Sequence, residues 1–309
     1  MSACSSACPS GRIAVRAEGL VKSFGEVKAV DGVSFEAAAG ETFGIIGPDG
    51  AGKTTLFRLL TSLLIPDGGR AEVEGLDTVK DYKALRRIIG YMPGKFSLYQ
   101  DLSVEENLNF FATIYGTSVD ANRAQIEEIY SQIEPFKGRR AGKLSGGMKQ
   151  KLALCCSLVH KPKVLFLDEP TTGVDPVSRK EFWDMLGRLK KDGITILVST
   201  PYMDEAGRCD RIAFVREGRF LTIDSPAGIV ARFPDRLYAV RSDRMHSLLG
   251  DVREYSKTLR AFSFGESVHL TASERLDGGE IEDFLQGKGH SGVTVKEINP
   301  SVEDCFMGI

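Results

Sequence analysis

A glycine-rich segment near the start of the chain carries residue types that could hold phosphate groups. Its glycines allow a tight loop with inward-pointing N–H groups, its lysine adds positive charge for β- and γ-phosphates, and a threonine hydroxyl suits Mg²⁺. We therefore predict a nucleotide site here, with Thr54 as one metal ligand. The nine residues are Gly47, Pro48, Asp49, Gly50, Ala51, Gly52, Lys53, Thr54 and Thr55.

The flanking sequence predicts the strand and the helix that such a loop requires. Residues 41–46 form a short run typical of a buried strand, and residues 56–60 place apolar side chains at helical spacing. A loop between them would set a bound anion at a helix N-terminus, where the peptide dipole favours negative charge. A purely structural glycine-rich turn is the alternative, and this context argues against it.

Two adjacent acids, Asp168 and Glu169, follow the apolar residues 164–167 and form a second candidate for chemistry. This pattern is typical of a central parallel strand whose carboxyl end carries a site. Asp168 suits Mg²⁺ binding, directly or through water. Glu169 suits orienting or activating an attacking water. Two solvated carboxylates at a strand end are the alternative.

Two further segments are candidates for nucleotide contacts. Ser145, Gly146 and Gly147 precede an apolar helix predicted over residues 151–159, and backbone donors at such a helix start suit an anion. Phe24, in a turn-like segment, could stack on a flat adenine ring. For a single Phe, a place in the core is the alternative.

The pattern of elements predicts an α/β fold in which a loop of the P-loop type sits in a mostly parallel core sheet. An antiparallel β subdomain precedes the loop, and a helical subdomain is inserted at about residues 94–150, with Ser103 as a helix N-cap. A small α+β appendage ends the chain. We expect a disordered tail at residues 1–12, a nucleotide-binding domain at 13–233 and the appendage at 234–309.

Composition limits the function classes further. The 309 residues carry a formal net charge of −2 with both signs interspersed, which gives no general attraction for nucleic acid or anionic membranes. The longest apolar runs fall far short of the ~20 residues that span a bilayer, so we expect a soluble chain. Reduced cytosolic thiols suit the scattered cysteines better than disulfides do. They are Cys4, Cys8, Cys155, Cys156, Cys209 and Cys305.

The ordered motifs resemble those of ATP-binding cassette (ABC) proteins over residues 13–233. Residues 47–55 match the Walker A loop, 144–150 the signature, 164–168 the Walker B strand and 173–175 the D-loop. The resemblance implies two cassettes that meet head to tail around ATP and Mg²⁺. Ser145, Gly146 and Gly147 would then act on the partner's ATP.

Residues 148–150 and 200–206 are most similar to the exporter branch of this family, which includes drug-efflux subunits. That similarity implies a separate transmembrane permease subunit of the ABC-2 kind and no nucleic-acid partner. It also implies a cytoplasmic position on the inner face of the cell membrane. Residues 95–99 are where we expect a helix of the permease to dock, although Phe96 and Tyr99 could instead pack internally.

Two positions depart from the family pattern, and both concern the γ-phosphate. Gly94 stands where the family has a Gln, and Pro201 stands where it has a switch His. Losing one preorganised transition-state contact typically costs about 10²–10³ in rate. Gln100 and Thr200 could compensate in part.

Three functional hypotheses remain open. The first is an ATPase that drives export, and the second is a hydrolysis-impaired, ATP-holding half of an asymmetric dimer. The third, a nucleic-acid or ribosome-associated cassette protein, is disfavoured by the single cassette without a basic arm.

Overall fold

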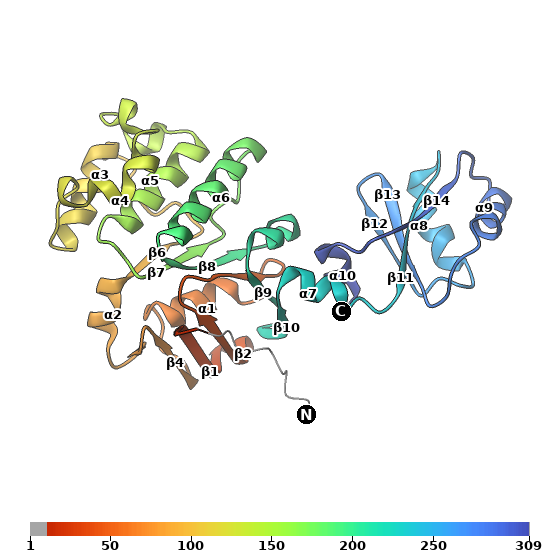
Figure 1. Cartoon of the computed structure of the whole chain (residues 1–309), viewed down its shortest axis with the longest axis horizontal. Helices are drawn as coiled ribbons and strands as arrows, with labels where there is room; N and C mark the ends of the chain where they lie inside the picture. Colours follow the sequence, from red (N-terminus) through yellow and green to blue (C-terminus); the bar gives the residue numbers. More distant parts are fainter. Residues whose placement is uncertain (1–10, 309) are drawn as a thin grey trace. The chain divides into compact units, whose positions relative to one another are not determined.

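The computed structural model describes residues 11–308 as two compact units, one ending at Ser225 and the other beginning at Pro226 (Figure 1). This division falls ahead of α7 (Pro226–Ala231), whereas the sequence places the boundary between residues 233 and 234. Of the tail expected over residues 1–12, residues 1–10 lie outside the described part. Each unit contains its own hydrophobic core.

Among the described residues, the first unit is built on a six-stranded sheet in the order β10-β9-β3-β8-β7-β6. Neighbouring strands run parallel except β9 and β10, which form an antiparallel hairpin. Every residue of β3, β7 and β8 is buried, as expected for strands covered on both faces. This confirms the predicted α/β fold. The strands are β3 (Thr42–Ile46), β6 (Ile89–Met92), β7 (Val164–Asp168), β8 (Thr195–Thr200), β9 (Arg211–Arg216) and β10 (Arg219–Asp224).

An antiparallel sheet in the order β2-β1-β4-β5 packs beside this core. The sequence predicts this sheet ahead of the glycine-rich loop, but two of its strands come after the loop. Both sheets share one core with helix α1 (Lys53–Leu60). Between the sheets, the rings of Phe35 and Phe43 stack with their centroids 5.1 Å apart. The four strands are β1 (Ile13–Phe24), β2 (Val27–Ala38), β4 (Gly68–Val73) and β5 (Leu76–Asp77).

Helices α3, α4 and α5 lie together as the inserted helical part (Figure 1). Ser103 caps α3 as predicted, in a capping box with Glu106. Helix α5 begins at Gly146, ahead of the predicted start at residue 151, because Ser145 caps it and the two glycines continue into the helix. The helices of this unit besides α1 are α2 (Tyr82–Ile88), α3 (Val104–Ile114), α4 (Arg123–Tyr130), α5 (Gly146–Leu158) and α6 (Pro176–Lys191).

The second unit has a four-stranded antiparallel sheet in the order β12-β13-β11-β14. Its core elements follow one another as β-α-β-β-α-β, the split βαβ arrangement. The small α+β character expected here is present. The elements are β11 (Arg236–Arg241), α8 (Met245–Glu254), β12 (Arg260–Phe264), β13 (Ser267–Ala272), α9 (Gly278–Gly287), β14 (Thr294–Ile298) and the final helix α10 (Val302–Gly308).

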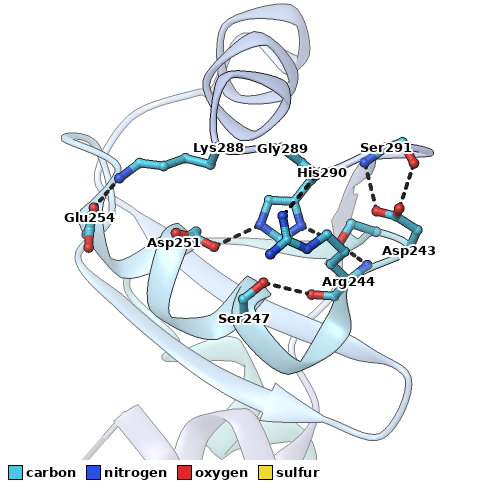
Figure 2. A network of polar contacts seen from close by, with 10 residues as sticks. Asp243, Arg244, Ser247, Asp251, Glu254, Lys288, Gly289, His290 and Ser291 are labelled. Carbon is cyan, nitrogen blue, oxygen red and sulfur yellow. Dashed lines mark hydrogen bonds and ion pairs between the residues drawn. The ribbon is translucent and has the colours of Figure 1, made fainter.

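A buried histidine ties three segments of the second unit together (Figure 2). His290 is only 3% exposed; its Nε2 lies 2.9 Å from an Asp251 carboxylate oxygen and its Nδ1 lies 2.8 Å from Ser242 Oγ. The Asp251 carboxylate can only accept a hydrogen bond, and Ser242 Oγ accepts the backbone N–H of Arg244 at 3.2 Å. The imidazole therefore donates from Nε2 to Asp251.

Replacing His290 should loosen this unit. His290→Ala leaves Asp251 and Ser242 without their partner, so we expect a loss of about 2–3 kcal/mol in the free energy of opening around α8 and β14. Hydrogen–deuterium exchange of the full chain measures that quantity segment by segment. The control is His246→Ala, an exposed residue of α8. Equal exchange in the two variants would contradict the assigned role of His290.

Candidate functional site

The glycine-rich loop connects β3 to α1 along a path that excludes side chains at two positions. A Cβ at Gly47 would lie 2.2 Å from the carbonyl oxygen of Val215. A Cβ at Gly52 would lie 2.0 Å from the carbonyl oxygen of Ala29. Gly52 also has a φ of 100°, a left-handed conformation that favours glycine, and it caps the start of α1. The loop geometry therefore depends on these glycines.

Lys53 occupies the centre of the site. Its side chain is 3% exposed, and Nζ donates to the carbonyl oxygens of Gly47 at 2.9 Å and Pro48 at 2.8 Å. The same Nζ lies 3.0 Å from Oε1 of Glu169. The structure thus joins the two motifs that the sequence suggests for chemistry, which lie more than a hundred residues apart.

An open hollow of about 140 Å³ lies over the start of α1. Its residues come from the loop, from α1, from β2 and from the end of β7, so most of the predicted phosphate-binding residues face one space. Within the loop, Ala51 is buried, whereas Pro48 and Asp49 are exposed. The lining residues are Ala29, Gly50, Gly52, Lys53, Thr54, Thr55 and Glu169.

The two acids at the end of β7 have different surroundings. Asp168 is buried and accepts a hydrogen bond of 2.6 Å from Ser199 Oγ. Glu169 has a φ of 49°, which is uncommon for a residue other than glycine. Its N–H donates to the carbonyl and hydroxyl oxygens of Ser199, each at 3.0 Å. Strand β8 therefore fixes both acids through one serine, and the unusual backbone directs Glu169 toward Lys53.

The half-buried phenol of Tyr91 adds to the electrostatics around Asp168. Burial, followed by the negative charge of Asp168, raises the pKa of Tyr91 to about 12. This tyrosine, in β6, therefore stays neutral at physiological pH.

Gly94 lies against these acids, although it carries no side chain. A Cβ at this position would be 2.9 Å from the carbonyl oxygen of Asp168 and 3.6 Å from Cβ of Glu169. The first distance is too short for an ordinary contact with backbone. A side chain at residue 94 would therefore require a shift of its own segment or of the end of β7.

The segment after Pro201 is held by a carboxylate that sequence analysis did not single out. Glu205 is 2% exposed and accepts hydrogen bonds from Thr200 Oγ1 at 2.6 Å and Thr171 Oγ1 at 2.7 Å. The guanidinium of Arg179 lies 4.1 Å from the ring centre of Tyr202 in the same segment. These contacts join the residues around Pro201 to those that follow Glu169. No local sequence pattern marks Glu205, because its partners lie on different elements.

The remaining predicted site residues lie outside the hollow. Ser145 and Gly146 are exposed at the start of α5, and Ser145 Oγ accepts from the N–H of Met148 at 3.4 Å. Gly147 packs against α6, because a Cβ there would lie 2.8 Å from Ser178 Oγ. Phe24 ends β1 with 52% of its surface exposed. None of these four residues lines the hollow around Lys53.

Two further properties of residues 11–308 bear on function. They contain no helix long and apolar enough to cross a membrane, and no cluster of three or more His, Cys, Asp or Glu side chains that could hold a metal. The cysteines described, Cys155, Cys156, Cys209 and Cys305, are buried and unpaired. Burial raises the pKa of the Cys155 and Cys209 thiols well above the usual value.

Comparison with known proteins places these motifs in one family. Residues 30–172 match the family model for ABC transporters. The probable multidrug ABC transporter ATP-binding protein YbhF of Escherichia coli (strain K12) is 40% identical over 275 residues, which cover 88% of this chain and 47% of that protein. This chain therefore spans about half the length of that relative.

Two other relatives match along most of both chains. The Nod factor export ATP-binding protein I of Rhizobium sp. (strain N33) is 33% identical over 300 residues, covering 96% of each chain. The daunorubicin resistance ATP-binding protein DrrA2 of Streptomyces coeruleorubidus is 34% identical over 311 residues, covering 95% of this chain and 94% of the relative.

Solved structures agree with the fold of the first unit. An ATP-binding cassette, MJ0796, in a dimeric post-hydrolysis state bound to ADP and Pi, has a TM-score of 0.62 at 26% identity and covers 68% of this chain and 98% of its own. Subunit cbiO1 of a Clostridium perfringens ABC transporter complex has a TM-score of 0.63 at 29% identity. The match covers 72% of this chain and 92% of cbiO1. The chain belongs to the ABC transporter ATP-binding proteins, in the branch whose curated members are named for export and drug resistance.

Proposed function

We propose that this chain binds Mg²⁺ and ATP at residues 47–55, hydrolyses the ATP at a head-to-tail dimer interface, and thereby powers export through a separate membrane subunit. The observation that carries the proposal is Lys53, whose ammonium group lies between the glycine-rich loop and Glu169. Phosphate oxygens entering the hollow would compete with Glu169 for that positive charge. Glu169 would then be free to orient or activate a water molecule.

The two predicted metal ligands are oxygen donors of the kind that Mg²⁺ prefers. Thr54 offers a hydroxyl oxygen and Asp168 a carboxylate oxygen, and Mg²⁺ in nucleotide sites usually takes one or two protein oxygens together with phosphates and water. When bound, the ion would neutralise part of the phosphate charge. Asp168 is suited to this role because Ser199 holds its carboxylate in one orientation.

Separation of the signature from the hollow supports the proposed dimer. Ser145 and Gly146 present the N-terminal end of the thirteen-residue helix α5 to solvent, outside the space around Lys53. Backbone donors at such an end attract anions. We infer that Ser145, Gly146 and Gly147 complete the nucleotide site of a second cassette. Phe24, exposed at the end of β1, is proposed as the adenine contact.

The partner in the membrane is proposed to dock on the helical part. A hollow there is lined by Phe96, Ser97 and Leu98 together with Phe111 of α3 and Tyr115, the residue after that helix. Further apolar side chains at Tyr99, Phe110 and Ile114 are exposed, with Tyr99 and Phe110 in edge-to-face contact. This surface includes most of residues 95–99, where the sequence predicts docking. We propose that a permease subunit of the ABC-2 type covers it.

A second candidate function is a hydrolysis-impaired, ATP-holding half of an asymmetric dimer. The crowding at Gly94 favours it, because the amide that the family places there has no space beside Asp168. Pro201 in turn offers neither an imidazole nor a backbone N–H. Both candidates predict nucleotide binding and differ in turnover.

Removing the charge of Glu169 tests the proposed site. Glu169→Gln should lower ATP turnover by about 10²–10³. It should also tighten ADP binding by about threefold to tenfold, because Lys53 loses its charged partner. A coupled ATPase assay and calorimetry measure the two effects. Glu254→Gln, in an exposed pair with Lys288, is the control. Undiminished turnover would contradict the role of Glu169.

Substitution of Gly94 separates the two candidate functions. We expect Gly94→Ala and Gly94→Gln each to lower turnover about tenfold, because a Cβ displaces the backbone of Asp168 and small misplacements are costly in catalysis. Gly187→Ala, at an open position in α6, is the control. Faster turnover by Gly94→Gln than by the wild type would instead identify a missing amide as the limiting defect.

Mixing two inactive variants tests the head-to-tail dimer. Lys53→Ala disables the phosphate loop and Ser145→Arg blocks the signature, so each variant alone should be inactive. Mixed dimers regain one complete site, and an equal mixture should recover about a quarter of wild-type turnover if the subunits pair at random. An ATPase assay across mixing ratios measures the recovery. Failure of the mixture, with an active wild type, would exclude a site shared between two copies.

A further inference from the structure

The turn between β9 and β10 lies directly against the phosphate loop. The backbone N–H of Gly218 donates to the carbonyl oxygen of Ala51 at 3.1 Å. On its other side, the Gly218 carbonyl accepts the N–H of Asp31 in β2 at 2.9 Å. One glycine therefore connects the loop to a strand of the antiparallel sheet, although it is more than 160 residues away from the loop in sequence.

The approach is too close for a side chain. Gly218 has a φ of 74°, and a Cβ on it would lie 2.9 Å from the carbonyl oxygen of Ala29. A Cβ on Gly52 would lie 2.0 Å from this carbonyl oxygen of Ala29. It would also lie 3.5 Å from Cα of Gly218. Three backbone segments thus meet around one carbonyl, with no side chain between them.

Ion pairs on the outer side hold the turn in place. Arg219 donates from Nε to a carboxylate oxygen of Asp31 at 2.8 Å, and Lys28 approaches the other carboxylate oxygen at 3.4 Å. Glu217, the first residue of the turn, has a φ of 51° and shares the left-handed conformation of Gly218. The turn is therefore fixed from both sides.

The hydrogen bond to Ala51 bears on phosphate binding because of peptide geometry. In a planar trans peptide, the carbonyl and the following N–H point in opposite directions. With the Ala51 carbonyl directed at the turn, the N–H of Gly52 is directed away from it. Gly52 lines the hollow beside Lys53, and N–H groups of such a loop are the phosphate donors.

We propose that Gly218 is a positioning residue for nucleotide binding, which acts through Ala51 to keep the N–H of Gly52 available to phosphate. The inference rests on the proposed function, since it requires the hollow to bind a nucleotide. It adds the β9–β10 turn, which touches no substrate, to the elements that determine phosphate affinity.

The test compares Gly218→Ala with Gly75→Ala in the full-length chain. Gly75 has a φ of 77° in the turn between β4 and β5, but a Cβ there meets nothing within 4 Å. Both variants therefore place an alanine in the same left-handed conformation, with similar backbone strain. Only Gly218→Ala also disturbs the glycine-rich loop. Calorimetric titration measures ADP binding to each variant. We expect ADP to bind Gly218→Ala about tenfold more weakly than the wild type, because one hydrogen bond is lost. Gly75→Ala should bind ADP with wild-type affinity.

Melting temperatures provide the second readout. A purely structural role predicts that Gly218→Ala loses more stability than Gly75→Ala while both variants keep the wild-type ADP affinity. Equal ADP affinities of the two variants would overturn the inference. A wild type that fails to bind ADP would overturn the proposed function as well. If Gly218→Ala does not fold, Arg219→Gln loosens the turn from outside, and we expect about threefold weaker ADP binding from the weakened ion pair. Its control is Arg70→Gln, which breaks the exposed pair with Glu18; equal affinities of these two variants would also overturn the inference.

Discussion

The ammonium group of Lys53 is the interaction on which the site depends. A buried positive charge is costly unless it is paired and hydrogen-bonded. Here two loop carbonyls and the Glu169 carboxylate meet that requirement. The arrangement also fixes the geometry of the hollow, because the loop, α1 and the end of β7 converge on one nitrogen atom. Under the proposed function, phosphate binding would be an exchange of partners at Lys53 rather than the creation of a new charge site.

Much of the rest of the site is backbone rather than side chain. The loop contacts Val215 and Ala29 at distances that exclude a Cβ, and the end of β7 leaves no space at residue 94. The side chains mainly support this backbone through hydrogen bonds. Ser199 does so for the two acids, and Glu205 does so for the segment after Pro201. A substitution can therefore change the chemistry here without altering any residue that touches substrate.

The parts predicted correctly from the sequence are those set by short-range patterns. The glycine-rich loop with its strand and helix, the acids that end β7 and the cap at Ser103 each depend on neighbouring residues. The start of α5 was predicted too late, because two glycines have low helix propensity and the capping of Ser145 outweighed it. Contacts between distant segments, such as those of Glu205 and Gly218, follow from strand order, which no local pattern contains. The same holds for the two strands that join the antiparallel sheet after the loop.

The order of the strands also affects how the chain can fold as it is synthesised. Strand β3, which leads into the phosphate loop, pairs with β8 and β9, and its first residue, Thr42, lies opposite Ile196. A ribosome adds about 5–20 residues per second. On the order of 10–30 s therefore pass between the synthesis of β3 and the synthesis of β8 and β9, its neighbours in the sheet. During that interval an apolar strand is exposed without pairing partners. Nascent chains of this topology therefore carry an aggregation-prone strand until β8 and β9 have emerged.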